Sequence, residues 1–412
     1  MSAAAAPRAA RAAPRAGLLT VEGLTSYRLA NGLQVLLVPD DSKPTTTVNL
    51  TFHVGSRHEN YGETGMAHLL EHLMFKGTPR HAEVWGEFGK RGLRANGTTS
   101  YDRTNYFASF AADADNMKWY LDWLADAMVN SHIARKDLDT EMTVVRNEME
   151  RGENDPQRVM WQRAMAGLYD WHNYGKSTIG ARSDVENVDI PRLQAFYRMY
   201  YQPDNATLVV SGAFDRAQTL AWIDEFFGRI PAPQRKLPKL YTLDPAQDGE
   251  RSYTVRRSGG VPILMAAYHA PAAAHKDYAA AEVLAMVMLD EPAGRLYQAL
   301  VEKGLAASVT GGSWDLADPG AMLFGATLAP GQDVEVARKA LLATLEGFAS
   351  RPVTDEEVKR ARTRWLNEWE RRYTNPENVG VALSDAVGQG DWRLFFLLRD
   401  RVRAVTAADV QR

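Results

Sequence analysis

Two histidines and a glutamate stand close together in the segment GMAHLLEHLMFKGT, residues 65–78. On a helix, His68 and His72 lie one turn apart on one face, so both imidazoles can reach the same metal ion. Glu71 follows His68 by three residues and lies on the same side. The order H-x-x-E-H is the reverse of the H-E-x-x-H helix of zinc peptidases. The spacing therefore predicts a metal site with Glu71 beside the ion.

The rest of this helix is apolar on almost every side, which predicts that it is buried. Its apolar residues are Met66, Leu69, Leu70, Leu73, Met74 and Phe75. Two imidazoles and a carboxylate in a buried helix need polar partners. The alternative is that backbone carbonyls satisfy the histidines and that the glutamate is exposed. A metal ion satisfies all three groups together, and we therefore favour it.

A catalytic zinc ion needs a third protein ligand and keeps one position for water. The chain has no cysteine, so this ligand must come from His, Asp or Glu. The predicted helix 137–152 carries Glu141, Val144, Val145 and Glu148 at i, i+3, i+4 and i+7, which places two carboxylates on one partly apolar face. Both remain candidates on spacing alone, unless the face is simply exposed. Glu150 points away from this face and is a weaker candidate.

The helix 137–152 has a counterpart later in the chain. With an offset of 220, the segment VVRNEMERGENDP (144–156) matches RWLNEWERRYTNP (364–376) at five positions. Glu148 falls on Glu368, whereas Glu141 falls on Ala361, and the second half contains no H-x-x-E-H segment. The repeat predicts two related domains. It also predicts that only the first domain holds a metal.

Each half alternates strand-like and helix-like segments, which predicts an α+β fold. We expect two homologous domains, each a mixed, mostly antiparallel sheet with helices packed on it. The expected strands are 33–40, 45–54, 100–111 and 206–212, and the expected helices are 64–77, 114–130 and 137–152. The predicted division is a leader at 1–19, a zinc-bearing domain at 20–230, a linker at 231–248 and a second domain at 249–412. A counterpart of strand 206–212 is missing from the second half, so we expect truncation or a partner at that sheet edge.

Composition restricts the remaining function classes. The 412 residues carry a formal charge of −3, which gives no indication of nucleic-acid binding. No apolar run is long enough for a transmembrane helix. The start of the chain is rich in Ala, Arg and Pro, as in a disordered leader, a transit peptide or the remainder of an export signal. The compartment is left unknown, with a periplasmic or exported location favoured over the cytoplasm or the mitochondrial matrix.

Four segments together resemble the pitrilysin/insulinase family of inverted zinc peptidases, especially its half-length subunits akin to mitochondrial processing peptidase. They are the H-x-x-E-H segment, the glutamate 76 residues after its second histidine, ANGTTSYDRTNY (95–106) and GRLYQALVEKGLA (294–306). The resemblance implies half of a clam-shaped peptidase with one Zn²⁺ per chain. It implies His68, His72 and Glu148 as zinc ligands, Glu71 as the catalytic base and Glu141 as the acid that orients a ligand.

The same resemblance implies how a peptide substrate binds. The strand matching 95–106 pairs with an extended peptide in this family, which makes Ala95, Asn96 and Thr98 the expected substrate contacts. Active members also present an Arg and a Tyr that contact the substrate and its oxyanion. Val301 and Ala307 stand at those two positions here. We therefore expect a heterodimer with a homologous chain that supplies both groups, and a homodimer as second choice. The alternative function is a weak or non-catalytic scaffold subunit.

Overall fold

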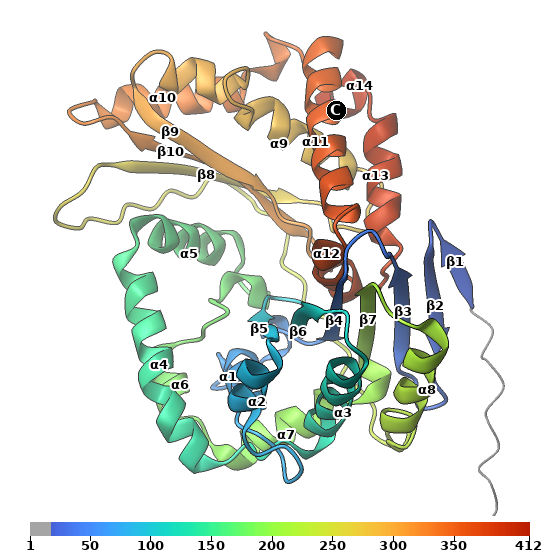
Figure 1. Ribbon diagram of the computed structural model, residues 1–412. Coiled ribbons are helices and arrows are strands. Elements are labelled where there is room, and N and C mark those ends of the chain that lie inside the picture. The colour runs from blue at the N-terminus through green and yellow to red at the C-terminus, as the bar shows by residue number, and fades with distance from the viewer. Residues whose placement is uncertain (1–17) are drawn as a thin grey trace, which may run out of the picture.

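The computed structural model describes residues 18–412 (Figure 1). Of the leader expected at 1–19, residues 1–17 lie outside the described residues. A strand begins at Leu19, within the last part of that range. The first half forms a seven-stranded sheet in the order β1-β2-β3-β7-β4-β6-β5, antiparallel except for the parallel pair β3 and β7. The strands are β1 (Leu19–Val21), β2 (Leu24–Arg28), β3 (Gln34–Pro39), β4 (Thr45–Phe52), β5 (Arg94–Thr99), β6 (Thr104–Ala111) and β7 (Ala206–Gly212).

One face of this sheet carries helices of the same half. A large apolar core lies between them, with residues such as Leu50, Phe52, Leu70 and Trp123 fully buried. The helices of the first half are α1 (Met66–Met74), α2 (Val84–Arg91), α3 (Ala114–Asn130), α4 (Arg135–Asn154), α5 (Pro156–Leu168), α6 (Arg182–Glu186), α7 (Ile190–Tyr200) and α8 (Arg216–Phe226). The expected linker 231–248 falls inside 227–262, a described stretch without helix or strand.

The second half forms a three-stranded antiparallel sheet in the order β8-β10-β9. Its strands are β8 (Ile263–Ala270), β9 (Ala306–Ser313) and β10 (Gly320–Leu328), and a single π-helical turn spans Tyr297–Val301. Its helices are α9 (Tyr278–Leu289), α10 (Val334–Leu345), α11 (Asp355–Tyr373), α12 (Pro376–Gly388), α13 (Leu394–Ala404) and α14 (Ala407–Gln411). Mixed layers of sheet and helix thus occur twice, and the predicted fold class is confirmed.

The helix starts show the internal repeat directly. Helices α4 and α11 both begin 21 residues before a proline that opens the next helix, and the two starts are 220 residues apart. The caps before those prolines are Asp155 and Asn375, each of which accepts a hydrogen bond from the backbone two residues on. Helices α3 and α10 also begin 220 residues apart, and each is capped by an aspartate, Asp113 and Asp333. Local sequence signals therefore set the same helix boundaries in both halves.

Each half places one helix on the other half's sheet. Helix α12 covers the second face of the first sheet, where Leu383 and Val387 pack with Leu36 and Val209. Helix α5 lies against the second sheet, where Met165 packs with residues of β10. This exchange is visible in Figure 1, where α12 lies beside β4 and β7, and α5 lies below β8. The two halves therefore share apolar cores and form one body.

Three expectations about local structure were wrong in detail. The expected strand 100–111 is the second arm of a hairpin, so the segment 95–106 contains most of β5, a turn and the start of β6. The polar run SYDR at 100–103 makes this turn. The helix that carries the H-x-x-E-H segment spans 66–74 rather than 64–77. No helix among residues 18–412 has the length and apolar character needed to cross a membrane.

Candidate metal centre

Helix α1 has only nine residues, so tertiary packing must hold it in place. Six of these residues are buried: Met66, Ala67, Leu69, Leu70, Leu73 and Met74. Phe75, directly after the helix, stacks on Trp123 of α3 with ring centroids 5.9 Å apart. The short helix is therefore fixed against the core, and its polar residues project from the remaining side.

A buried glutamate caps the start of α1. The Glu59 carboxylate accepts hydrogen bonds from the backbone N–H of Gly65 at 3.0 Å and of Ala67 at 2.9 Å. Its side chain is almost fully buried, and this burial raises the pKa of Glu59 to about 8. The Thr64 hydroxyl donates to Asp184 instead of capping the helix, and Gly65 takes the N-cap position with φ 91°. Sequence reasoning missed Glu59, because a cap from outside the helix has no fixed spacing.

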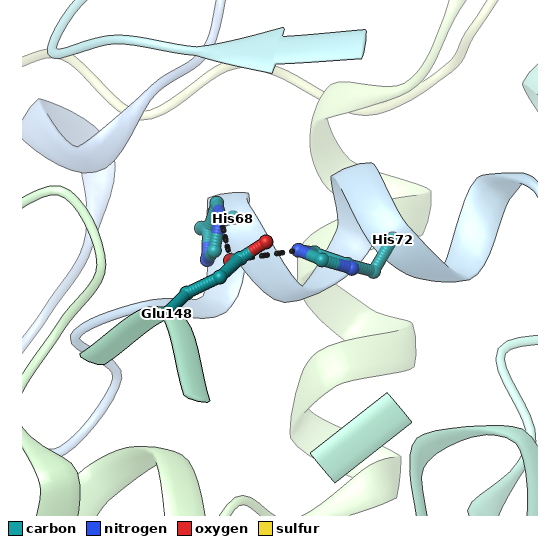
Figure 2. A group of neighbouring side chains, drawn as sticks. All are labelled: His68, His72 and Glu148. Atoms are coloured by element: carbon teal, nitrogen blue, oxygen red, sulfur yellow. Dashed lines mark ion pairs between the residues drawn. The ribbon is translucent and has the colours of Figure 1, made fainter. Parts of the chain in front are cut away.

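The structure brings His68, His72 and Glu148 together (Figure 2). One ligand atom from each residue lies within 4.8 Å of the other two. Glu148 projects from α4 towards both rings, and its Oε2 lies 3.5 Å from each Nε2 atom. Among the residues that the structure describes, this is the only group of three or more such side chains with metal-ligand spacing.

This donor set fits a zinc ion. Two imidazole nitrogens and one carboxylate oxygen form a common catalytic zinc set. The 3.5 Å separations are close to the roughly 3.4 Å expected between neighbouring ligands of a tetrahedral ion with bonds of 2.0–2.1 Å. Burial, together with the neighbouring His72, lowers the pKa of His68 to about 3. His68 is therefore neutral at physiological pH, which is the form that binds a metal.

Glu141 lies behind His72. Its Oε2 is 3.0 Å from His72 Nδ1, and its other oxygen pairs with Lys76. Burial opposes ionisation of Glu141, but hydrogen bonds from Lys76 and His72 outweigh it and lower the pKa of Glu141. An ionised carboxylate here favours a proton on Nδ1 and leaves the lone pair of Nε2 directed at Glu148. Glu148, and not Glu141, thus completes the group of three.

The prediction of which residues of α4 face the core was partly wrong. Val145 is fully buried, but Val144 is 43 % exposed. The core-facing stripe of α4 runs through Leu138, Met142, Val145 and Met149 instead. Glu141 and Glu148 flank this stripe, because each lies one residue before a core residue. Both carboxylates therefore sit at the rim of the core, where they can reach α1.

Glu71 projects from the same helix and lies against β5. Thr99 donates a hydrogen bond to Glu71 Oε2 at 2.6 Å. Burial raises the pKa of Glu71, and the charge of Glu148 adds to this, while the hydrogen bond from Thr99 opposes it. A carboxylate with a raised pKa is a better proton acceptor near neutral pH. The arrangement places a carboxylate with a raised pKa beside His68, His72 and Glu148.

Strand β5 is an edge strand, so one row of its backbone groups is open to an added strand. Of the expected contacts, Asn96 is exposed and Ala95 packs partly against the core. The Thr98 hydroxyl points away from Glu71 and donates to Asn105. The neighbouring Thr99 faces Glu71, since successive strand residues point to opposite faces. Thr99, which was not predicted, is thus the threonine on the Glu71 face, and the role of Thr98 as a substrate contact stays a prediction.

Gly97 leaves the room that Glu71 occupies. A Cβ atom at position 97 would lie 2.9 Å from Glu71 Cγ and 3.2 Å from a ring atom of Phe75. We predict that Gly97→Ala displaces the Glu71 carboxylate and lowers kcat on the order of ten- to a hundredfold. Zinc content should be unchanged. The control is Gly89→Ala, which has open space around it, and the comparison is steady-state hydrolysis of a fluorogenic peptide. Equal kcat values for both variants would contradict this role.

Val301 and Ala307, which stand where the resemblance implies an Arg and a Tyr, lie in the second half. Val301 ends the π-helical turn and is half-buried against the second core, and Ala307 is exposed on β9. Arg295, just upstream, is 2 % exposed and binds both oxygens of Glu357 at 2.7 and 2.8 Å. It also donates to the carbonyls of Arg351 and Pro352. Arg295 is therefore fully engaged in the fold and is not free to bind a substrate.

Comparison with known proteins assigns both halves to related families. The family described as Insulinase (Peptidase family M16) matches residues 34–182, and the Peptidase M16 inactive domain matches 187–364. The zinc protease PqqE of Helicobacter pylori is 29 % identical over 375 residues, covering 89 % of this chain and 84 % of that protein. An uncharacterized zinc protease of Mycobacterium leprae is 26 % identical over 344 residues, covering 82 % and 77 %.

Solved structures show the same architecture. A protease from Helicobacter pylori superposes with a TM-score of 0.88 at 26 % identity, and the match covers 94 % of this chain and 95 % of that one. The periplasmic protease PqqL from Escherichia coli gives a TM-score of 0.74 at 21 % identity, covering 96 % of this chain and 46 % of that one. At 21 % identity, the similarity to PqqL shows a shared fold and nothing further.

Proposed function

Because the chain belongs to peptidase family M16, the pitrilysin/insulinase family, as a half-length member, we propose that it is a zinc-dependent endopeptidase acting on extended or unfolded peptides. The observation that carries this proposal is the group of His68, His72 and Glu148, with Glu71 beside it. A non-catalytic scaffold subunit has no need of a complete donor set with an adjacent base. The intact group therefore favours an enzyme.

The chain's own residues would divide the work of catalysis. His68, His72 and Glu148 would hold the zinc ion, and Glu141 would fix the ring of His72 through Nδ1. When bound, zinc supplies Lewis acidity for the scissile carbonyl and for water. Glu71 takes a proton from the attacking water and delivers it to the leaving amine nitrogen. The open edge of β5 would hold the peptide extended beside Glu71 through backbone hydrogen bonds.

The metal assignment predicts a loss of zinc on substitution of one carboxylate. Glu148→Gln should reduce zinc from about one ion per chain to a small fraction, because an amide oxygen is a much poorer ligand than a carboxylate. Glu150→Gln, two residues along the same helix and exposed, is the matched control and should retain zinc. Elemental analysis of both purified proteins makes the measurement. Stoichiometric zinc in Glu148→Gln would move the third ligand elsewhere, with Glu141 the next candidate.

The proposal extends to a partner chain. Val301 and Ala307 stand where the resemblance implies an Arg and a Tyr, and neither side chain can donate a hydrogen bond. A homologous chain that lacks H-x-x-E-H but carries both groups would complete the site in a heterodimer. The compartment stays unknown, and we favour the periplasm or another exported location; PqqL of Escherichia coli, a periplasmic protease with the same fold, is consistent with this.

A further inference from the structure

A partly buried polar cluster joins the two halves of the molecule next to the candidate metal centre. Arg57 precedes α1, and its guanidinium Nη1 donates to Asp318 Oδ2 at 2.7 Å. Its Nε lies 3.0 Å from Asp102, in the turn between β5 and β6. Asp318 belongs to the loop between β9 and β10, 261 residues further along the chain. His72 and the other candidate ligands do not take part in this cluster.

The cluster is closed by hydrogen bonds from both halves. Tyr174 donates its hydroxyl hydrogen to Asp102 at 2.7 Å and accepts from the backbone N–H of Asp318 at 3.1 Å. The backbone N–H of Ala317 donates to the other oxygen of Asp102 at 2.9 Å. His172 Nε2 lies 3.1 Å from Asp318. Asp102 is almost fully buried, so these partners replace the water that its carboxylate would otherwise bind.

From this cluster, one route leads to the metal-binding helix. The carbonyl oxygens of Arg57 and Glu59 both accept from Asn173 Nδ2, at 2.8 and 2.7 Å. Glu59 in turn caps α1 through Gly65 and Ala67, and His68 is the next residue. A displacement of Arg57 would therefore reach the first ligand through one tightly hydrogen-bonded loop.

A second route leads to the strand beside Glu71. The backbone N–H of Ser56 donates to the carbonyl of Ser100 at 3.1 Å, and that of Arg57 donates to Tyr101 at 2.9 Å. Ser100 directly follows Thr99, the residue that holds Glu71. Asp318 contacts Arg57 from the second half. Arg57 is thus also where the loop before α1 meets the turn that follows β5.

We propose that Asp318 is a positioning residue of the metal centre: through Arg57 it fixes both the capped start of α1 and the end of β5. The second domain then contributes to the site although it holds no ligand. The inference rests on the proposed zinc site, and its kinetic readout rests on the proposed peptidase activity as well. Its effect on zinc affinity can be measured without any substrate.

Asp318→Asn tests this role, because it removes the charge and keeps the size of the side chain. We expect the zinc dissociation constant, measured by chelator competition, to rise about tenfold, as for other partners that orient metal ligands. We expect kcat of the zinc-loaded protein to fall by a similar factor, with little change in KM. The matched control is Asp290→Asn. Asp290 is likewise an aspartate of the second half that pairs with arginine, here Arg360 and Arg364, and it is more buried than Asp318 and lies away from the cluster.

The control separates positioning from general stability. Asp290→Asn should lower Tm but leave zinc affinity and kcat unchanged. Should Asp318→Asn fail to fold, Tyr174→Phe removes the hydroxyl that joins Asp102 to Asp318 and should weaken zinc binding in the same direction. The proposal is wrong if the wild type and the cluster variant bind zinc with equal affinity. It is also wrong if the cluster variant and Asp290→Asn lose zinc affinity to the same extent. A wild-type chain that binds no zinc would instead refute the proposed function itself.

Discussion

The Glu71→Gln variant should bind zinc as the wild-type chain does and hydrolyse peptides on the order of 10²–10⁴-fold more slowly. Glutamine keeps the size of the side chain and can still accept the hydrogen bond from Thr99. Its amide oxygen cannot hold the proton of the attacking water. The three ligand side chains remain, so the metal site should stay intact. The loss should therefore appear in kcat, with KM nearly unchanged.

The measurement combines elemental analysis with hydrolysis of an internally quenched peptide at substrate saturation. Glu87→Gln is a suitable control, since Glu87 lies on the neighbouring helix α2 and pairs with Lys90 and Arg91. It should retain wild-type kcat. Near-normal hydrolysis by Glu71→Gln with zinc bound would show that another group takes the proton.

The sequence predicted the parts of this site that depend on local spacing. His68, Glu71 and His72 lie on a single helix, so the 3.6-residue period alone places them together. Chemistry and spacing left Glu141 and Glu148 as alternatives for the third ligand, and the resemblance to the pitrilysin/insulinase family selected Glu148. The internal repeat was detected from five identical residues at an offset of 220, which include Pro156 and Pro376, the prolines that open α5 and α12.

The remaining features depend on contacts between distant segments. Glu59 caps α1 from outside the helix, across a loop whose path no spacing rule predicts. Asp318 reaches Arg57 from the other half of the chain. The exposure of Val144 depends on which residues of α4 face the core, and two adjacent apolar residues left this open. The exchange of α5 and α12 between the sheets is likewise absent from any local pattern.

The partner proposal predicts weak hydrolysis by the isolated chain. Purified alone, the chain should bind about one zinc ion, because all three candidate ligands come from its own first half. It should cleave peptides slowly, because Val301 and Ala307 offer no hydrogen-bond donor to a substrate carbonyl or an oxyanion. Arg295 cannot replace them, since all its donor groups are bound to Glu357 and to backbone carbonyls.

Adding the partner should raise kcat/KM on the order of a hundredfold, the usual effect of one donor to a developing oxyanion. The partner is a homologous chain from the same source that lacks H-x-x-E-H and carries Arg and Tyr at the positions of Val301 and Ala307. Native mass spectrometry should show a one-to-one complex. A partner with both groups changed to alanine is the control, since it should still form the complex without raising the rate. If the isolated chain already hydrolyses peptides as fast as the complex, or the alanine partner activates equally, the heterodimer proposal is wrong and a homodimer becomes the preferred assembly.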